Sequence, residues 1–206
     1  MANFIPLHIH SEYSLLDGMI RVGDLVKYAK DNDVPAIAIT DHGVMYSAVE
    51  FYELAKHAGV NPLIGCEFYV HDGDIHVHDN AHNPLYHLIL IAKDNKGYKN
   101  LIKLVSTAWC EGFYYKPRIN FELLKQYSEG LICASACLGG ELLQHLLKNE
   151  YEQAKEVAKR YKDLFGEDYY IELQDHNLEE QKRTNPLLMK IANELGIKLI
   201  ITNDSH

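Results

Sequence analysis

Two histidines separated by one residue stand near the start of the chain, and their spacing suits metal binding. In an extended segment, His8 and His10 point to the same side, because successive side chains alternate between two faces. Asp17 follows after a polar turn, close enough to fold back over them. Together these side chains can bind a divalent metal ion. Without further ligands, the same pair would be read as two buried, hydrogen-bonded histidines.

More side chains of the metal-binding type follow other apolar runs in the chain. Each alone has an ordinary explanation as a turn residue, an ion-pair partner or a small buried thiol. Their joint recurrence after expected strands is harder to assign to chance. They are His42, Glu67 and Cys137, which follow the runs 36–40, 62–66 and 131–135, and Asp204 and His206, which follow the run 198–202 and repeat the spacing of two.

The apolar runs alternate with segments of helical periodicity, which predicts an α/β fold with parallel strands and crossover helices. A doubly wound sheet would offer a glycine-rich phosphate loop after its first strand, and none is present. We therefore expect a distorted seven-stranded (β/α) TIM-like barrel without a helix after the last strand. The expected strands are 4–10, 36–40, 62–66, 87–92, 131–135, 169–173 and 198–202, and the expected helices are 21–32, 46–58, 97–109, 121–127, 141–148, 151–165 and 178–195.

Active sites of such barrels lie at the carboxyl ends of the strands, where the candidate ligands would meet. His87 is the exception, because it opens its expected strand instead of closing it. A mixture of His, Asp, Glu and Cys suits zinc, manganese or iron. The number of ligands exceeds what one ion needs, so two or three ions are expected. Clusters of this kind hold phosphoryl groups and activate water.

Composition sets limits on the class of protein. The 206 residues, 47% hydrophobic and 24% charged, fit one globular domain, and we assign residues 1–206 to it. No apolar run is long enough to cross a membrane, and no secretory signal is recognisable, so a cytoplasmic protein is expected. Four cysteines without a CxxC pair fit a reducing compartment. The net charge of −9 argues against a large basic surface for nucleic acid.

Two loops carry further candidates. In the segment 111–119, Tyr115 could stack on a base, and Lys116 and Arg118 could contact phosphates, although a packed aromatic turn explains the same residues equally well. The segment 68–84 is expected to be an excursion whose histidines, at positions 71, 76, 78 and 82, are exposed to solvent.

Several blocks of the sequence, in order, resemble the PHP (polymerase and histidinol phosphatase) domain, in the form found at the N-terminus of bacterial DNA polymerase III alpha subunits. The resemblance extends over essentially the whole chain. The blocks are 7–18 (LHIHSEYSLLDG), 38–43 (AITDHG), 62–67 (PLIGCE), 111–118 (EGFYYKPR) and 202–206 (TNDSH).

The resemblance implies a distorted barrel with a trinuclear metal site and metal-dependent 3′–5′ exonuclease activity on DNA ends. It further implies that Asp41 orients a ligand, and we keep Asp41 and Arg118 as candidate catalytic residues. All nine ligand positions carry a suitable side chain, which favours an active site. The implied ligand sets are His8, His10, Glu67 and Asp204 for one ion, Glu67, His87 and Cys137 for a second, and Asp17, His42 and His206 for a third.

Because the palm, thumb and fingers of a polymerase are absent, we expect a piece of a longer polymerase that works with replisome subunits. Two alternatives stay open. The domain could be a scaffold that stabilises the polymerase and docks a separate proofreading subunit. It could also be a free-standing phosphatase of the histidinol-phosphatase type.

Overall fold

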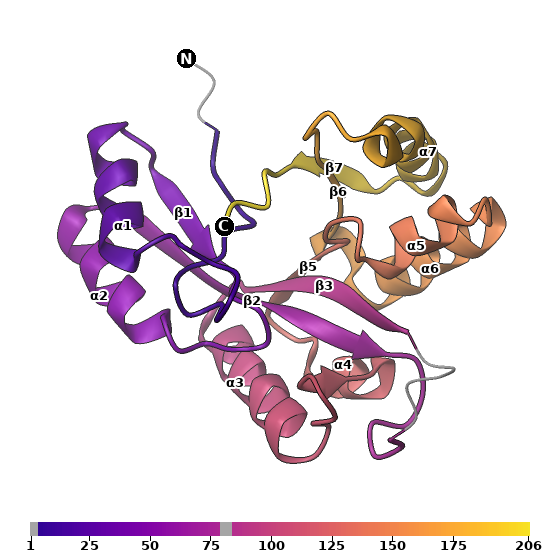
Figure 1. Cartoon of the computed structure of the whole chain (residues 1–206), viewed down its shortest axis with the longest axis horizontal. Coiled ribbons are helices and arrows are strands. Elements are labelled where there is room, and N and C mark those ends of the chain that lie inside the picture. Colours follow the sequence, from indigo (N-terminus) through magenta and orange to yellow (C-terminus); the bar gives the residue numbers. More distant parts are fainter. Residues whose placement is uncertain (1–3, 79–83) are drawn as a thin grey trace.

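A mixed sheet curled into an incomplete barrel forms the centre of the computed structural model, which describes residues 4–78 and 84–206 (Figure 1). The hydrogen-bonded strand order is β1-β2-β3-β5-β6-β7, and the two-residue β4 pairs with β2. The strands are β1 (Ala36–Ile39), β2 (Asn61–His71), β3 (Leu85–Ala92), β4 (Arg118–Ile119), β5 (Leu131–Ala134), β6 (Tyr169–Leu173) and β7 (Lys198–Ile201).

Seven α-helices in the described residues pack on the outside of this sheet (Figure 1). α1 packs on β1 and α2, α2 on β2, α3 on β2 and β3, and α4 on α3, whereas α5 packs on β3, α6 on β5 and β6, and α7 on β6 and β7. The expected helices are all present, with shifts of a few residues at their ends. They are α1 (Val22–Asp31), α2 (Ala48–Ala58), α3 (Asn95–Cys110), α4 (Phe121–Tyr127), α5 (Glu141–Leu147), α6 (Tyr151–Phe165) and α7 (Glu179–Leu195).

Local signals explain where several helices begin and end. The Asp94 carboxylate accepts a hydrogen bond from the amide of Gly97 at 2.8 Å and caps the first turn of α3. Asn120 caps α4 in the same way through Leu123. α2 ends at Gly59, whose φ of 78° places it in the left-handed region that favours glycine, as its position in the sequence predicts.

The direction of β3 departs from the expected all-parallel arrangement. β3 runs antiparallel to both β2 and β5, whereas β1 with β2, β5 with β6, and β6 with β7 are parallel. The connection between β2 and β3 contains no helix in its described part, so the chain turns back directly after β2. The first residues of β3 therefore lie at the edge of the sheet where its parallel neighbours end.

The expected first strand, residues 4–10, is an extended segment rather than a strand. It accepts hydrogen bonds from the amides of Ala38 and Thr40, at Pro6 and Ile9. On its other side its backbone pairs with Ser205, through a bridge at Ile9. Pro6 has no amide hydrogen to continue a ladder, and the β1 strand beside it is short. The strand ladder between β1 and β7 is therefore incomplete. The extended segment 4–10 joins these two edges of the curled sheet at one rim only.

The inside of the curled sheet is divided between an apolar end and a polar end. Alternation along β3 sends Ile89 and Ile91 inward, where they pack with Ala38, Ala134 and Ala136. The larger apolar clusters lie outside the sheet, between it and the helices. The polar end receives the side chains that the sequence proposed as ligands.

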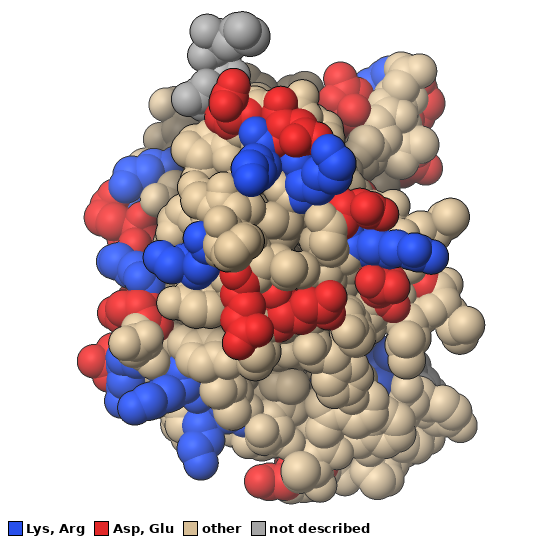
Figure 2. Space-filling model, turned by 90° about the vertical axis from the view of Figure 1, so that its left-hand side faces the viewer, with Lys and Arg blue, Asp and Glu red and all other residues tan. Residues whose placement is uncertain are grey.

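Charges of both signs are interspersed on the face of the molecule that carries α1 and α2 (Figure 2). The pairing of Lys27 with Asp31 along α1 is one example. A largely uncharged area lies at the lower right of this view (Figure 2). Among the described residues, no helix is long and apolar enough to span a lipid bilayer.

Candidate metal centre

The first group of ligands comes from the N-terminal segment, β2 and the segment after β7. His8 Nε2 lies 2.6 Å from Glu67 Oε2 and 3.1 Å from Asp204 Oδ1. His10 Nε2 lies 3.1 Å from the same Glu67 oxygen and 3.3 Å from the same Asp204 oxygen. The two ring nitrogens are 3.2 Å apart. Four donor atoms thus surround one point, and His8, His10 and Glu67 are buried.

The backbone explains why these side chains converge. The amide of His10 donates to the carbonyl oxygen of Ser205 at 2.8 Å, and the amide of Ser205 donates to that of His8 at 3.2 Å. This pairing places residues 8 and 10 opposite residues 204 and 206, with the alternation of both segments in register. His8 and His10 therefore lie opposite Asp204 and His206, which have the same spacing of two in the sequence.

The second group consists of Glu67, His87 and Cys137. His87 Nδ1 is in close contact with Glu67 Oε1, and Cys137 Sγ lies 3.5 Å from His87 Nδ1. His87 reaches the centre because β3 runs antiparallel, which brings its first residues to the ligand-bearing rim. The amide of His87 also donates to the carbonyl oxygen of Gly139 at 2.9 Å, which fixes this end of β3 to the loop that carries Cys137.

Replacing Gly139 by alanine is expected to disturb this group. A Cβ atom on Gly139 would lie 2.9 Å from His87 Nδ1 and 3.0 Å from Cγ, so the imidazole must move. Gly139→Ala should lower metal affinity by about 10-fold or more, measured by metal content after dialysis against graded chelator. Gly23→Ala on α1 is the matched control, because its Cβ would meet no atom within 4 Å. Equal metal retention by both variants would contradict this role of Gly139.

The third group joins Asp17, His42 and His206, with His10 close enough to contribute. His42 Nε2 lies 2.6 Å from Asp17 Oδ2, and His206 Nδ1 lies 2.8 Å from the same oxygen. The ring of His10 packs against those of His42 and His206, with centroids 4.0 Å and 4.4 Å away. This group is more exposed than the first, since Asp17 and His206 face solvent.

Glu67 belongs to two of these groups and lies next to the third. Burial alone would raise the pKa of its carboxyl, but contacts with His10, His42, His8 and His87 outweigh burial and hold the pKa well below its usual range. Glu67 is therefore an anion surrounded by imidazoles. Glu67 Oε1 and His42 Nδ1 are buried, lie 3.3 Å apart and form no well-oriented hydrogen bond, while His87 Nδ1 contacts the same oxygen. Ring nitrogens gathered around one carboxylate oxygen fit residues arranged to hold metal ions.

Glu172, a buried carboxylate on β6, supports the first group and was not among the residues expected from the sequence. Its Oε2 atom lies 3.0 Å from His8 Nδ1 and accepts a hydrogen bond from the Thr202 hydroxyl at 2.6 Å. Its Oε1 atom accepts from the amide of Ala136 at 3.0 Å. Glu172 thus fixes the ring of His8 with Nε2 turned toward the centre. An acidic residue within an otherwise apolar strand is the signal that could have identified it.

Glu172→Gln is expected to weaken metal binding by about 10- to 100-fold while the fold persists. Glutamine keeps an acceptor for Ala136 but removes the charge that orients His8. The measurement is metal affinity by competition with a chromogenic chelator. Glu152→Gln, on the exposed face of α6, is the control. Unaltered affinity in Glu172→Gln would show that the His8 ring is held by other contacts.

Asp41 is placed as an organiser behind the centre, not as a group open to a substrate. Its carboxylate is buried and accepts hydrogen bonds from the hydroxyls of Ser11, Ser14 and Ser47, at 2.6 to 2.9 Å. The Ser14 hydroxyl lies 3.2 Å from His10 Nδ1. Asp41 therefore acts on a ligand through Ser14, which agrees with an orienting role and speaks against direct catalysis.

Arg118 does not reach the centre, which corrects its assignment as a catalytic or phosphate-binding residue. Its guanidinium is buried and donates to the backbone carbonyl oxygens of Gly112, Ile75 and Val77. Through these three hydrogen bonds, Arg118 joins the loop that contains Gly112 to the loop that contains Ile75 and Val77.

Lys116 and Tyr115 lie on the loop that Arg118 braces. The ammonium of Lys116 lies over the ring of Tyr69, 5.1 Å from its centroid, and Tyr69 packs beside His42 and His87. Lys116 is thus close to the ligand groups, and its contact with a substrate stays a prediction. Tyr115 is 74% exposed, with a φ of 58°, and its ring contacts that of Tyr114.

The loop histidines divide into buried and exposed ones. His71 is the last residue of β2 and is buried, which corrects its expected exposure, because β2 extends five residues beyond Cys66. Burial, together with the charge of Arg118, lowers the pKa of His71. His76 and His78 are exposed as expected, and His82 lies outside the described residues.

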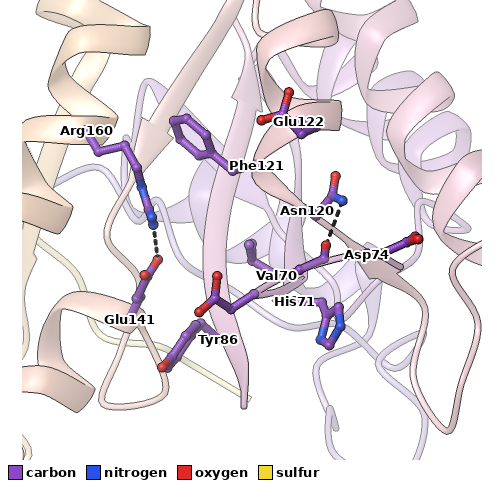
Figure 3. A pocket seen from close by; sticks show the side chains of 11 residues that line it. Val70, His71, Asp74, Tyr86, Asn120, Phe121, Glu122, Glu141 and Arg160 are labelled. Carbon is purple, nitrogen blue, oxygen red and sulfur yellow. Dashed lines mark hydrogen bonds and ion pairs between the residues drawn. The ribbon is translucent and has the colours of Figure 1, made fainter. Parts of the chain in front are cut away.

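A separate cavity of about 550 Å³ opens between the end of β2 and helices α4, α5 and α6 (Figure 3). An ion pair between Arg160 and Glu141, at 2.6 Å, lies on one side, and Asn120 donates to the carbonyl oxygen of Gly73 at 2.8 Å on the other (Figure 3). None of the nine candidate ligands lines this cavity. The candidate centre, at the rim of the curled sheet, is therefore distinct from this cavity.

A curled α/β sheet with three adjoining groups of His, Asp, Glu and Cys at one rim defines a domain suited to hold divalent metal ions. Residues 6–176 match the PHP domain family. The chain belongs to the PHP domain family, which confirms the resemblance drawn from its motifs.

Two DNA polymerase III alpha subunits are similar to the chain over its whole length. The chain is 46% identical over 207 residues to the DNA polymerase III subunit alpha of Borreliella burgdorferi, and 47% identical over 210 residues to that of Treponema pallidum. These matches cover 100% and 99% of the chain but 18% of each relative, so the chain spans about a fifth of their length.

Solved structures share the fold at low sequence identity. An amidohydrolase from Chromobacterium violaceum, with bound sulfate and no metal, gives a TM-score of 0.57 at 17% identity. A candidate metal-dependent phosphoesterase from Bifidobacterium adolescentis gives 0.52 at 17% identity. Each covers 100% of this chain and 88% of its own. The α/β architecture is thereby shared with other proteins.

Proposed function

We propose that the chain is a metal-dependent phosphodiesterase that acts as a 3′–5′ proofreading exonuclease on DNA. One observation carries this proposal: three ligand groups adjoin one another, and Glu67 is shared between two of them. A shared carboxylate is the group that joins neighbouring ions in a polynuclear site. Two or three ions of zinc, manganese or iron suit the donor set.

The residues of the chain would hold and tune these ions. The groups His8–His10–Glu67–Asp204, Glu67–His87–Cys137 and Asp17–His42–His206 would supply the ligands. When bound, the ions would provide Lewis-acid stabilisation of a phosphoryl group and activation of water.

The charge state of the carboxylates favours this role. Contacts with His10 and the nearby charge of His8 outweigh burial and lower the pKa of Asp204 to about 2, so it is an anion at neutral pH. Glu172 orients His8 from behind. Lys116 offers a positive charge for a phosphate at the edge of the centre.

The relatives support a setting in DNA replication. Because the similar proteins are DNA polymerase III alpha subunits of much greater length, we infer that the chain works as a domain of a longer polymerase. Its partners would then be DNA 3′ ends, the remainder of the polymerase and other replisome subunits.

The test is the release of mononucleotides from single-stranded DNA labelled at its 5′ end, with manganese present. A ladder that shortens from the 3′ end is expected, and His10→Ala and Asp204→Ala should abolish it. His57→Ala, an exposed histidine of α2, is the control that keeps full activity. Cleavage of histidinol phosphate without cleavage of DNA would assign the chain to the small-molecule phosphatases. A metal-loaded protein inert toward both would be a scaffold whose metals are structural.

A further inference from the structure

Two aromatic rings are exposed side by side close to the third ligand group. Trp109, near the end of α3, and Phe113, in the loop that follows, stack with centroids 5.3 Å apart and ring planes 18° apart. They remain 41% and 46% exposed. Adjacent exposed aromatic rings are typical of a surface that contacts another molecule.

Backbone contacts fix this ring pair relative to the metal centre. Trp109 Nε1 donates to the carbonyl oxygen of Gly43 at 2.8 Å. Gly43 directly follows His42, and its amide donates to the carbonyl oxygen of Glu67 at 2.7 Å. A Cβ atom on Gly43 would lie 2.7 Å from Pro117 Cγ, and its φ of 62° favours glycine, so the loop closes tightly here. The indole is thus hydrogen-bonded to Gly43, the residue that directly follows the candidate ligand His42.

A positive charge lies on the same loop as Phe113. Lys116 contacts the ring of Tyr69, which packs against His42 and His87. Exposed aromatic rings combined with a basic side chain, here on the same loop, are what proteins use to bind single-stranded nucleic acids, whose bases stack while the phosphates meet cations. The net charge of −9 limits such binding to a short contact.

We propose that Trp109 and Phe113 form a stacking surface for the bases of a single-stranded nucleic-acid end, with Lys116 on its phosphates. The proposal rests on the proposed function, because it assigns the substrate of that centre as an unpaired strand. Stacking uses the faces of the bases, so little sequence preference is expected. An unpaired end, as at a mismatch, would reach this surface more readily than a paired one.

The fluorescence of Trp109 tests this directly, because it is the one tryptophan of the chain. Titration of the metal-loaded protein with single-stranded DNA, made resistant to cleavage by phosphorothioate linkages, should quench the emission. An abasic oligonucleotide of equal length and charge should not. Equal quenching by the base-containing and the abasic oligonucleotide, or quenching by neither, would overturn the stacking surface and indicate that the rings contact a protein partner instead.

Variants separate stacking from the fold. Phe113→Ala should weaken binding by about 5- to 150-fold, as expected for one lost base stack, and Phe113→Tyr should restore it. Tyr28→Ala removes an exposed ring from α1 and should leave binding unchanged. Lys116→Gln should reduce the slope of log K against log salt by about 0.7. Unchanged binding in Phe113→Ala would overturn the proposal.

This binding assay is independent of hydrolysis. Quenching by base-containing DNA in a protein that cleaves no DNA would contradict the exonuclease proposal and support the stacking surface. Cleavage of DNA without base-dependent quenching would support the exonuclease proposal and contradict the stacking surface.

Discussion

Glu67→Gln is expected to empty the metal centre and to abolish hydrolysis. Glutamine fills the same volume but removes the anion that lies within 3.1 Å of both His8 Nε2 and His10 Nε2 and that also contacts His87. Loss of groups that merely orient ligands costs about 10- to 100-fold in metal affinity, so loss of this shared ligand should cost at least about 100-fold. Elemental analysis and the release of mononucleotides measure the two effects.

The control for Glu67→Gln is Glu53→Gln, an exposed position on α2 where the same chemical change meets solvent. Circular dichroism should show that both variants keep the helices. Full metal content in Glu67→Gln would mean that the three ligand groups act separately and that no ion depends on the shared carboxylate.

Metal loading is expected to stabilise the fold strongly. Ligands that bind only the folded state add about 4 kcal/mol to the free energy of unfolding at 1,000 times their Kd. For a chain of this size, that corresponds to a rise in Tm of about 8 to 16 °C. The effect should be large because the ligands come from segments that few other contacts join, such as residues 8–10 and 204–206. Calorimetry of chelator-treated protein, with and without added manganese or zinc, measures it.

His10→Ala is the variant that checks this stabilisation, since His10 contributes to two of the groups. Its Tm should respond little to metal, whereas His57→Ala should respond like the unaltered protein. An equal rise in Tm for both variants would place the stabilising ions elsewhere on the molecule.

Local patterns predicted most of the elements, because each helix carries its apolar periodicity in its own residues. α4 and α6 begin and end at the residues expected from the sequence. Strand β6 does so as well. The convergence of the candidate ligands was predicted from the rule that active sites of (β/α) barrels lie at the carboxyl ends of the parallel strands.

The direction of β3 could not be read in this way. A buried apolar strand has the same composition in either direction, and only its partners decide which end meets the site. For the same reason His87 fitted the predicted site through the family resemblance alone, and the structure supplies the physical cause.

Side-chain roles that depend on distant neighbours were the least predictable. Glu172 looks like an ordinary polar residue of a strand until Thr202 and His8 are placed against it. Arg118 has the chemistry of a phosphate ligand, but carbonyl oxygens from two loops occupy it. Such assignments need the tertiary structure, because the competing partner is remote in the sequence.

The pairing of residues 8–10 with residues 204–206 has a consequence for biosynthesis. Donor atoms for the same ions are separated by nearly two hundred positions, so a nascent chain still inside the ribosome at Asp204 cannot complete the cage. The helices and inner strands can form earlier, as local segments emerge. Ion capture is then a late event of maturation, and a ribosome-bound product truncated before Asp204 would be folded in part and unable to retain the full set of cations.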